Sequence, residues 1–232
     1  MAETSTGFIA VATGLLAEAR IAASMGGTRA IAGGGDHERL GAEIERAIAD
    51  GAKGVLSFGI AGGLKPGLET GAVVVARAVS HGPECRAADV AWSRELRRLL
   101  PGAIEADVAG VEAAVTSAAD KLELNQATGA VACDMESHIV ARVAQTRGVP
   151  FAVVRVVADP AARALPSVAL VGMKKDGATD VGAVLAGLAV HPWQLPALVR
   201  VGLDTRRAMA VLFGCGRRLG AGAGLLGARL GG

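Results

Sequence analysis

Residues 131–159 of this chain read VACDMESHIVARVAQTRGVPFAVVRVVAD, a pattern that predicts a helix followed by a strand. Asp134 can cap a helix that ends at Arg147, with Glu136 in its first turn and apolar residues spaced along one side. A glycine and a proline then break the helical pattern. The β-branched run 151–157 is typical of a strand buried in a parallel sheet.

The lengths of these two elements bring two acids back to one place. The helix rises roughly 20 Å at 1.5 Å per residue, and the strand returns by roughly 26 Å at about 3.3 Å per residue. We therefore expect Glu136 and Asp159 at the carboxyl edge of the sheet, where open α/β folds bind ligands. From the spacing alone, Glu136 could equally be an acid at a helix N-terminus, and Asp159 a turn residue before a proline.

Strands and helices alternate along the rest of the chain, which indicates the α/β class. We expect one domain over residues 1–213, built as a mixed, largely parallel twisted sheet flanked by helices. A chain of 232 residues can bury a substantial core. Residues 214–232, rich in Gly, Leu and Arg, are expected to form a flexible tail.

Composition narrows the class of protein. The net charge of +2, with both signs interspersed, indicates no nucleic-acid partner. The three cysteines are far apart and favour a reduced, cytoplasmic protein. Neither a signal peptide nor a run of about 18 apolar residues is found, so we expect no membrane span. Residues 81–85 (HGPEC) offer three metal-binding side chains, but a proline makes them a turn and no second cluster supports them, so we expect no metal site.

The first strand, at residues 7–12, leads through Gly14 into a helix over 15–25. Glu18 lies one turn into that helix. It can be an acid above the carboxyl end of the strand or a glutamate that faces solvent, and taken alone the pattern favours the second.

A second strand at 28–32 is followed by three glycines, 33–35, that open a helix over 36–50. A glycine loop at a helix N-terminus can bind an anion through its free backbone N–H groups. It can equally be a tight turn capped by Asp36, and the residues alone leave the two interpretations even.

The third strand, at 53–58, runs into the glycine-rich segment 59–64. A dinucleotide fingerprint fails there, because Ala61 interrupts the required glycine pattern and a proline and glycines exclude the helix that should follow. We expect instead a turn whose backbone approaches a ligand, with a hairpin-like return through 69–71. Further along, we expect strands at 73–79, 104–108 and 113–117, helices at 91–100, 119–126, 181–190 and 195–213, and a hairpin over 168–181.

Three blocks of sequence resemble a known superfamily. They are the first strand with Glu18 behind it, residues 57–76 (SFGIAGGLKPGLETGAVVVA), and residues 130–159 with their DME and AD elements. In this order they are similar to the purine nucleoside phosphorylase and methylthioadenosine/S-adenosylhomocysteine nucleosidase superfamily. The resemblance implies a three-layer sandwich and cleavage of the N-glycosidic bond of a purine nucleoside. Residues 165–188 resemble the hopanoid-biosynthesis branch, whose members release adenine from adenosylhopane.

The resemblance also implies roles for individual residues. Asp159 takes the place of the catalytic acid that hydrogen-bonds N7 of the purine. Glu136 takes the place of the glutamate that holds the ribose hydroxyls, with Met135 packed against the sugar. Glu18 falls on the glutamate with which hydrolytic members activate water. The backbone of the segment after the third strand is expected to approach the substrate at Ala61 and Gly62.

The nucleophile stays open at this point. The glycines expected to bind phosphate or hold a water molecule are Gly14, Gly34 and Gly35. Phosphate is therefore a candidate co-substrate, and no other cofactor is expected. Ile60 stands where relatives commonly have a serine, and no arginine-bearing phosphate loop follows Gly14, which weakens the phosphorylase interpretation.

These residue types suit the chemistry. The bond breaks through an oxocarbenium-like sugar, so the base needs a proton or a strong hydrogen bond and the sugar needs acceptors. An aspartate that keeps its proton at pH 7 needs a pKa shift of about three units, roughly 4 kcal/mol. Burial of Asp159 beside apolar residues acts in that direction. Arg155 is expected to pair structurally, and His138 to pack or to lie on the surface.

A hopanoid substrate would need an apolar exit from the purine site. The apolar residues between Leu165 and Met173 could form that wall and touch the inner face of the membrane, or they could form an ordinary hairpin or a subunit interface. The expected partners are a small, lipid-linked purine nucleoside and a second copy of the chain in a homodimer. The alternatives are a phosphorylase or nucleosidase acting on soluble nucleosides, and a purine-nucleoside-binding module without activity.

Overall fold

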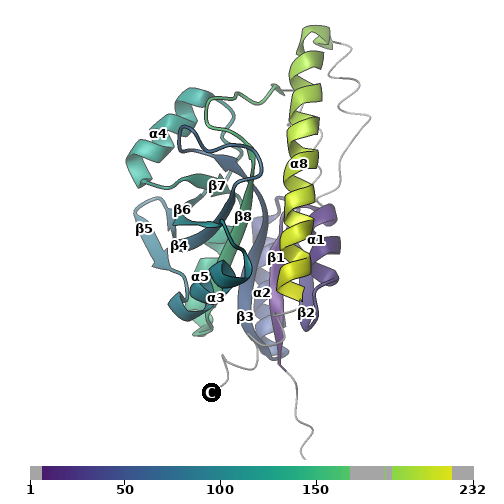
Figure 1. The fold of residues 1–232 in the computed structure, drawn as a ribbon. Coiled ribbons are helices and arrows are strands. Elements are labelled where there is room, and N and C mark those ends of the chain that lie inside the picture. The colour runs from purple at the N-terminus through teal and green to yellow at the C-terminus, as the bar shows by residue number, and fades with distance from the viewer. Residues whose placement is uncertain (1–6, 168–185, 187–189, 221–232) are drawn as a thin grey trace, which may run out of the picture.

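The structure is a computed structural model that describes residues 7–167, 186 and 190–220 (Figure 1). The strands are β1 (Phe8–Thr13), β2 (Thr28–Ala32), β3 (Ala52–Gly63), β4 (Val73–His81), β5 (Glu84–Ala87), β6 (Ile104–Gly110), β7 (Ala132–Asp134) and β8 (Phe151–Asp159). The helices are α1 (Leu16–Ala23), α2 (His37–Ala49), α3 (Val90–Leu99), α4 (Ala118–Thr128), α5 (Ser137–Arg147), α8 (Leu195–Gly220) and the 3-10 turn η1 (Pro192–Gln194).

The described strands form one mixed sheet in the order β2-β1-β3-β7-β6-β4-β5, and β8 pairs with both β3 and β4. β8 runs parallel to β3, with Val55 beside Phe151 and Ala61 beside Val157, and antiparallel to β4. β1, β2 and β3 are parallel to one another, as are β4, β6 and β7. The predicted class, a largely parallel sheet flanked by helices, is confirmed.

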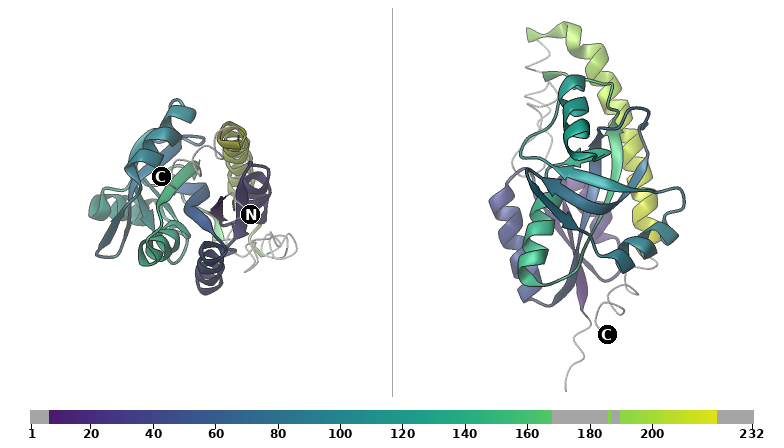
Figure 2. Two further views of the ribbon diagram at one scale, coloured as in Figure 1. Left: turned by 90° about the horizontal axis from the view of Figure 1, so that it is seen from below. Right: turned by 90° about the vertical axis from the view of Figure 1, so that its left-hand side faces the viewer.

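Helices cover both faces of the sheet and make three layers (Figures 1 and 2). α2 and α5 pack on one face, together with Val153 and Val157 of β8. α1, α3 and α8 pack on the other face, with Val154 and Val156. Because strand side chains alternate between the two faces, the apolar run of β8 supplies both cores.

Four expectations about the middle of the chain were wrong. β3 does not turn at Gly59 but continues as a strand through the glycine-rich segment to Gly63. β3 and β4 do not form a hairpin, because β8 pairs with both and lies between them. Residues 113–117 form no strand. The helix expected from Asp134 begins at Ser137, and Asp134 instead ends β7.

The boundary expected at residue 213 falls inside α8, so residues 214–220 belong to the folded domain rather than to a tail. α8 continues to Gly220, and Cys215 and Leu219 in its last turns are buried against the sheet. The hairpin predicted over 168–181 and most of the helix predicted over 181–190 lie outside the described residues. None of the helices in the described ranges has both the length and the apolar character needed to span a bilayer.

Candidate active site

An open cavity lies where the carboxyl ends of β1, β3 and β8 meet, the edge at which α/β folds bind ligands. Its empty volume is about 800 Å³ with the open mouth included. Glu18, Glu136 and Asp159 all line it. The convergence of Glu136 and Asp159 expected from the helix and strand lengths is therefore present in the fold.

Glu18 is buried in the floor of this cavity, with 1% of its surface exposed, so the solvent-facing interpretation was wrong. Its Oε2 accepts the backbone N–H groups of Gly14 and Leu15, each at 2.9 Å, and its Oε1 accepts that of Ile60 at 2.8 Å. Burial raises the pKa of Glu18, while the nearby Arg155 and these three N–H donors oppose the rise. A carboxylate held in this way is fixed in position and is a stronger base than an exposed glutamate.

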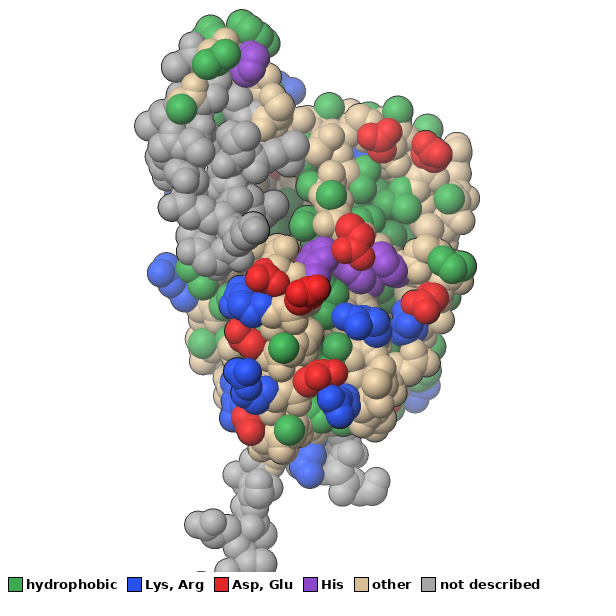
Figure 3. Space-filling view, turned by 180° about the vertical axis from the view of Figure 1, so that it is seen from behind, with side chains coloured by type: hydrophobic (Ala, Val, Ile, Leu, Met, Phe, Trp, Pro, Cys, Tyr) green, Lys and Arg blue, Asp and Glu red, His purple; other side chains and the backbone are tan. Residues whose placement is uncertain are grey.

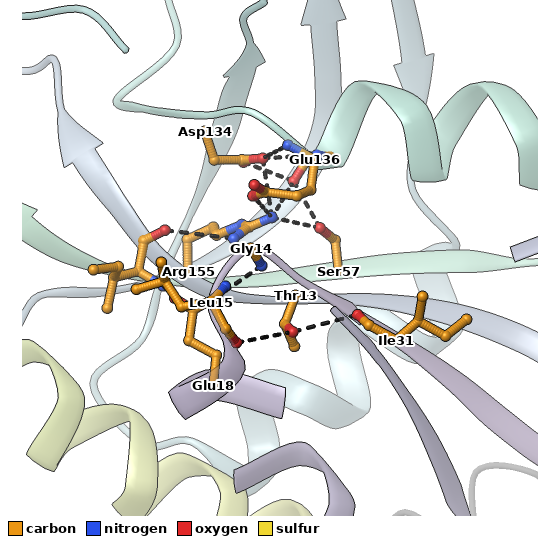
Figure 4. Close-up of polar contacts among 11 residues, drawn as sticks. Thr13, Gly14, Leu15, Glu18, Ile31, Ser57, Asp134, Glu136 and Arg155 are labelled. Atoms are coloured by element: carbon orange, nitrogen blue, oxygen red, sulfur yellow. Dashed lines mark hydrogen bonds and ion pairs between the residues drawn. The ribbon is translucent and has the colours of Figure 1, made fainter. Parts of the chain in front are cut away.

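Arg155 lies at the centre of the polar network beneath the cavity and is completely buried (Figure 4). One guanidinium nitrogen donates to Ser57 Oγ at 2.6 Å and to Asp134 Oδ1 at 2.9 Å, and lies 3.3 Å from Glu136 Oε2. Burial acts to lower the pKa of Arg155, but Asp134, Glu136 and Glu18 outweigh it and raise that pKa. Arg155 therefore holds three acids together, the structural pairing that we expected.

Glu136 is held at the N-terminus of α5 by its neighbour Asp134. Asp134 Oδ1 accepts the backbone N–H groups of Glu136 at 2.8 Å and Ser137 at 2.6 Å. Burial raises the pKa of Glu136 to about 7. The positive charge of Arg155 opposes this rise, and the negative charges of Asp134 and Glu18 add to it. Near neutral pH the Glu136 carboxyl can therefore gain or lose its proton, and a positive charge forming beside it would favour the ionised form.

Replacing Glu136 by Gln is expected to stabilise the protein at pH 8. The pKa of Glu136 in the folded state, about 7, lies above its ordinary 4.5. Its contribution to stability is therefore fully present below about pH 4.5 and is lost as pH rises through 7. Gln stays neutral, so the free energy of unfolding of the variant should exceed that of the wild type by on the order of 3 kcal/mol at pH 8 and match it near pH 4.5. Urea unfolding at both pH values measures this difference.

The control for that experiment is Glu43→Gln, which removes a carboxylate that pairs with Arg39 on the surface. Exposed pairs contribute little, so Glu43→Gln should change the free energy of unfolding by under about 1 kcal/mol at either pH. A Glu136→Gln variant no more stable than the wild type at pH 8 would contradict the raised pKa.

Asp159 forms an ion pair with Lys121, a residue that the sequence did not indicate. Lys121 of α4 is fully buried, and its Nζ donates to Asp159 Oδ2 at 2.5 Å, to Arg163 O at 2.9 Å and to Pro160 O at 3.3 Å. Burial raises the pKa of Asp159, and the Lys121 ammonium opposes that rise. The three acceptors satisfy all three N–H groups of Lys121. The pair can share a proton directly beside the cavity.

Most of the remaining residues predicted for the site line the same cavity, namely Ala61, Gly62, Met135, Gly14 and Gly35. A Cβ at Gly14 would lie 2.7 Å from Glu136 Oε1, so a larger residue there would displace the Glu136 carboxylate. Gly34 does not line the cavity, and its N–H donates to the Gly14 carbonyl at 2.9 Å. That bond joins the segment after β2 to the segment after β1, and a role for Gly34 at a phosphate or water site stays a prediction.

Comparisons with known proteins agree with this architecture. The sequence model of a family described as the Phosphorylase superfamily matches residues 4–191. No curated protein matches the sequence. Several solved structures share the fold. One is the 5'-methylthioadenosine/S-adenosylhomocysteine nucleosidase of Helicobacter pylori, with a TM-score of 0.67 and 17% identity, covering 93% of this chain and 97% of that one.

Two further solved structures are similar. The 5'-methylthioadenosine/S-adenosylhomocysteine nucleosidase of Neisseria meningitidis, in complex with methylthio-immucillin-A, has a TM-score of 0.65 and 18% identity, covering 95% of this chain and 99% of that one. The futalosine hydrolase of Helicobacter pylori has a TM-score of 0.59 and 18% identity, covering 66% of this chain and 88% of that one. At these identities the likeness is one of fold.

Proposed function

This chain belongs to the phosphorylase superfamily, and on that premise we propose that it cleaves the N-glycosidic bond of a purine nucleoside with water as the nucleophile. The observation that carries the proposal is the meeting of Glu18, Glu136 and Asp159 in one cavity. Each comes from a different part of the chain. Glu18 and Glu136 share the charge of Arg155, and Asp159 pairs with Lys121. The similar nucleosidase and hydrolase structures support the same class of reaction.

The three acids divide the chemistry among them. Asp159, paired with Lys121, donates a hydrogen bond or a proton to the departing base. Glu136 accepts hydrogen bonds from the ribose hydroxyls, and its ionised form favours the positive charge that develops on the sugar. Glu18 accepts a proton from the attacking water. Its three backbone donors fix the carboxylate in place before the reaction begins.

Electrostatics favour water over phosphate as the nucleophile. Within the described part of the chain, no lysine or arginine lines the cavity. Arg155 and Lys121 lie behind it, and both are already paired with carboxylates. A phosphate ion would therefore face Glu18 and Glu136 without a free cation to balance its charge. These contacts support a nucleosidase rather than a phosphorylase.

For the substrate itself we propose adenosylhopane, a nucleoside joined to an apolar hydrocarbon. The resemblance of residues 165–188 to the hopanoid branch supports this choice, as does the apolar wall formed by Val111, Val115 and Leu165. In α8, the exposed apolar side chains Leu195, Val199 and Leu203 follow one another at a spacing of four residues. Such a stripe suits contact with a lipid-linked substrate or a membrane surface.

Adenine release tests both parts of the proposal. Purified protein is given adenosylhopane or methylthioadenosine, with and without phosphate, and adenine is measured by chromatography. We expect release in phosphate-free buffer, with a higher kcat/KM for adenosylhopane. Strict dependence on phosphate would identify a phosphorylase. Preference for methylthioadenosine would replace the hopanoid assignment with a soluble nucleoside, and binding without any release would indicate a binding module.

A further inference from the structure

Three of the four histidines of this chain meet outside the nucleoside cavity. His37 begins α2, His81 ends β4, and His138 lies in the first turn of α5. All three surround Glu112, in the loop after β6, and line a second cavity. Figure 3 shows these histidines as one patch on the face of the molecule, beside acidic and basic side chains. We call the four residues the histidine cluster.

The nitrogen atoms of the histidine cluster converge on one carboxylate. Glu112 Oε2 lies 2.8 Å from His37 Nδ1, and Glu112 Oε1 lies 3.3 Å from both His81 Nε2 and His138 Nε2. The ligand atoms of His37, Glu112 and His138 all lie within 4.8 Å of one another. A tetrahedral ion about 2.0 Å from each ligand would separate the ligand atoms by about 3.3 Å. The distances from Glu112 to the three histidine nitrogens are close to that separation.

The hydrogen bond that His81 makes to the backbone leaves its inner nitrogen available. His81 Nδ1 lies 3.0 Å from the Gly110 carbonyl, which can only accept, so this nitrogen carries a proton. In the neutral ring, the lone pair is then on Nε2 and faces Glu112. A metal-binding histidine usually donates a hydrogen bond from its other ring nitrogen to a carbonyl or carboxylate.

Two other ring nitrogens, His37 Nε2 and His138 Nδ1, are buried and have no hydrogen-bond partner among the described residues. A proton on either would therefore be buried without an acceptor. Each of these two rings, when neutral, therefore carries its one proton on the nitrogen that faces Glu112, and an ion that binds there must displace that proton to the outer nitrogen.

The rings of His81 and His138 are also stacked, with their centroids 4.3 Å apart. Two imidazolium rings at that distance would repel each other. Neutral rings stack without that repulsion, and neutral imidazole is the form that binds metal.

Charge and donor type select the class of ion. Glu38, Glu84 and Glu112 line this cavity, against the two guanidinium groups of Arg86 and Arg142. The surroundings are therefore negative overall when the histidines are neutral. Imidazole nitrogen with a single carboxylate suits zinc and its first-row neighbours, whereas magnesium and calcium prefer sites built from oxygen.

We propose that His37, His138 and Glu112, with His81 as a fourth ligand, form a binding site for a divalent transition metal such as Zn²⁺. Each ligand comes from a different element, so the ion would join α2, the end of β4, the loop after β6 and α5. Glu112 follows Val111 of the nucleoside cavity, and His37 lies two residues after Gly35 of that cavity. The site would therefore fix one wall of the nucleoside cavity in place. The prediction of no metal site at residues 81–85 was based only on residues that are neighbours in the sequence.

Calorimetry with Zn²⁺ alone tests the site in the full-length chain. The measurements use a Cys85→Ser background, because Cys85 is an exposed free thiol that could bind zinc on its own. We expect one Zn²⁺ per chain. Glu112→Gln and His37→Ala should each weaken its binding by at least about 100-fold, since even outer partners of a metal ligand contribute 10–100-fold. The Glu112 side chain is 66% exposed, so the first variant should fold normally.

His191→Ala is the matched control, because His191 is the remaining histidine and lies apart from the cluster, against Trp193. It should bind Zn²⁺ as the background protein does. With Co²⁺ as the probe, the visible absorption of a tetrahedral site should appear in the background protein and be lost in His37→Ala. Zn²⁺ binding that is absent from the background protein, or that survives both Glu112→Gln and His37→Ala, would overturn the proposal.

Discussion

Asp159→Asn is expected to lower the kcat of adenine release by about 10³-fold while substrate binding changes little. Asn keeps the size and a hydrogen-bonding group but cannot give a proton to the departing base. Asp159 Oδ2 also accepts a hydrogen bond from Lys121 Nζ at 2.5 Å. Through this contact Lys121 can return a proton to Asp159 after Asp159 has given one to the base. Single-turnover adenine release and calorimetric binding of substrate measure the two effects separately.

Two further variants make that result interpretable. Asp159→Asn leaves the Lys121 ammonium buried without its carboxylate, which could weaken the fold. The double variant Lys121→Met with Asp159→Asn removes this charge and should be folded but equally inactive. Asp107→Asn, which changes an aspartate paired with Arg77 away from the cavity, should keep full activity. A folded Asp159→Asn variant with more than about a tenth of wild-type kcat would remove Asp159 from the reaction.

Arg155→Met is expected to lower the free energy of unfolding by about 3–5 kcal/mol at pH 8. Met fills a similar volume but leaves Glu18, Asp134 and Glu136 buried close together without a cation. Three carboxyl groups in that position must either repel one another or take up protons. The loss should therefore be smaller at pH 5, where protonation relieves the repulsion. Urea unfolding at the two pH values measures it.

The comparison for this variant is Arg29→Met. Arg29 pairs with Asp50 at the surface, where the two side chains are 47% and 48% exposed, and such pairs contribute little. The Arg29→Met variant should lose less than about 1 kcal/mol of its free energy of unfolding at both pH values. If Arg155→Met and Arg29→Met destabilised the protein equally, the buried network would not hold the site together.

The course of residues 131–159 was predictable because each element there has a strong pattern and a regular rise. The strand was expected to end at Asp159, and β8 does so. The helix was expected to bring Glu136 to the same edge, and both acids line one cavity. The helix start was misplaced by three residues, because Asp134 caps α5 through its carboxylate while its backbone belongs to β7.

The glycine-rich end of β3 was not predictable from local propensity. Glycine disfavours strands, so residues 59–63 were expected to form a turn. In the fold, a Cβ at Gly59 would lie 2.6 Å from an Arg155 nitrogen and 2.8 Å from Glu18 Oε1. Glycine is needed there because the buried ion network passes close to the strand. That requirement comes from residues distant in the sequence.

The sequence alone determined the α/β class, the helix and strand of residues 131–159, and the meeting of Glu136 with Asp159. These follow from periodicity and from the fixed rise per residue of helices and strands, which act over short distances along the chain. Only the tertiary structure decided that Glu18 is buried, that Lys121 pairs with Asp159 from 38 residues away, and that three histidines surround Glu112. Such contacts depend on how the layers pack, because the energy of a buried charge is set by neighbours that local patterns do not identify.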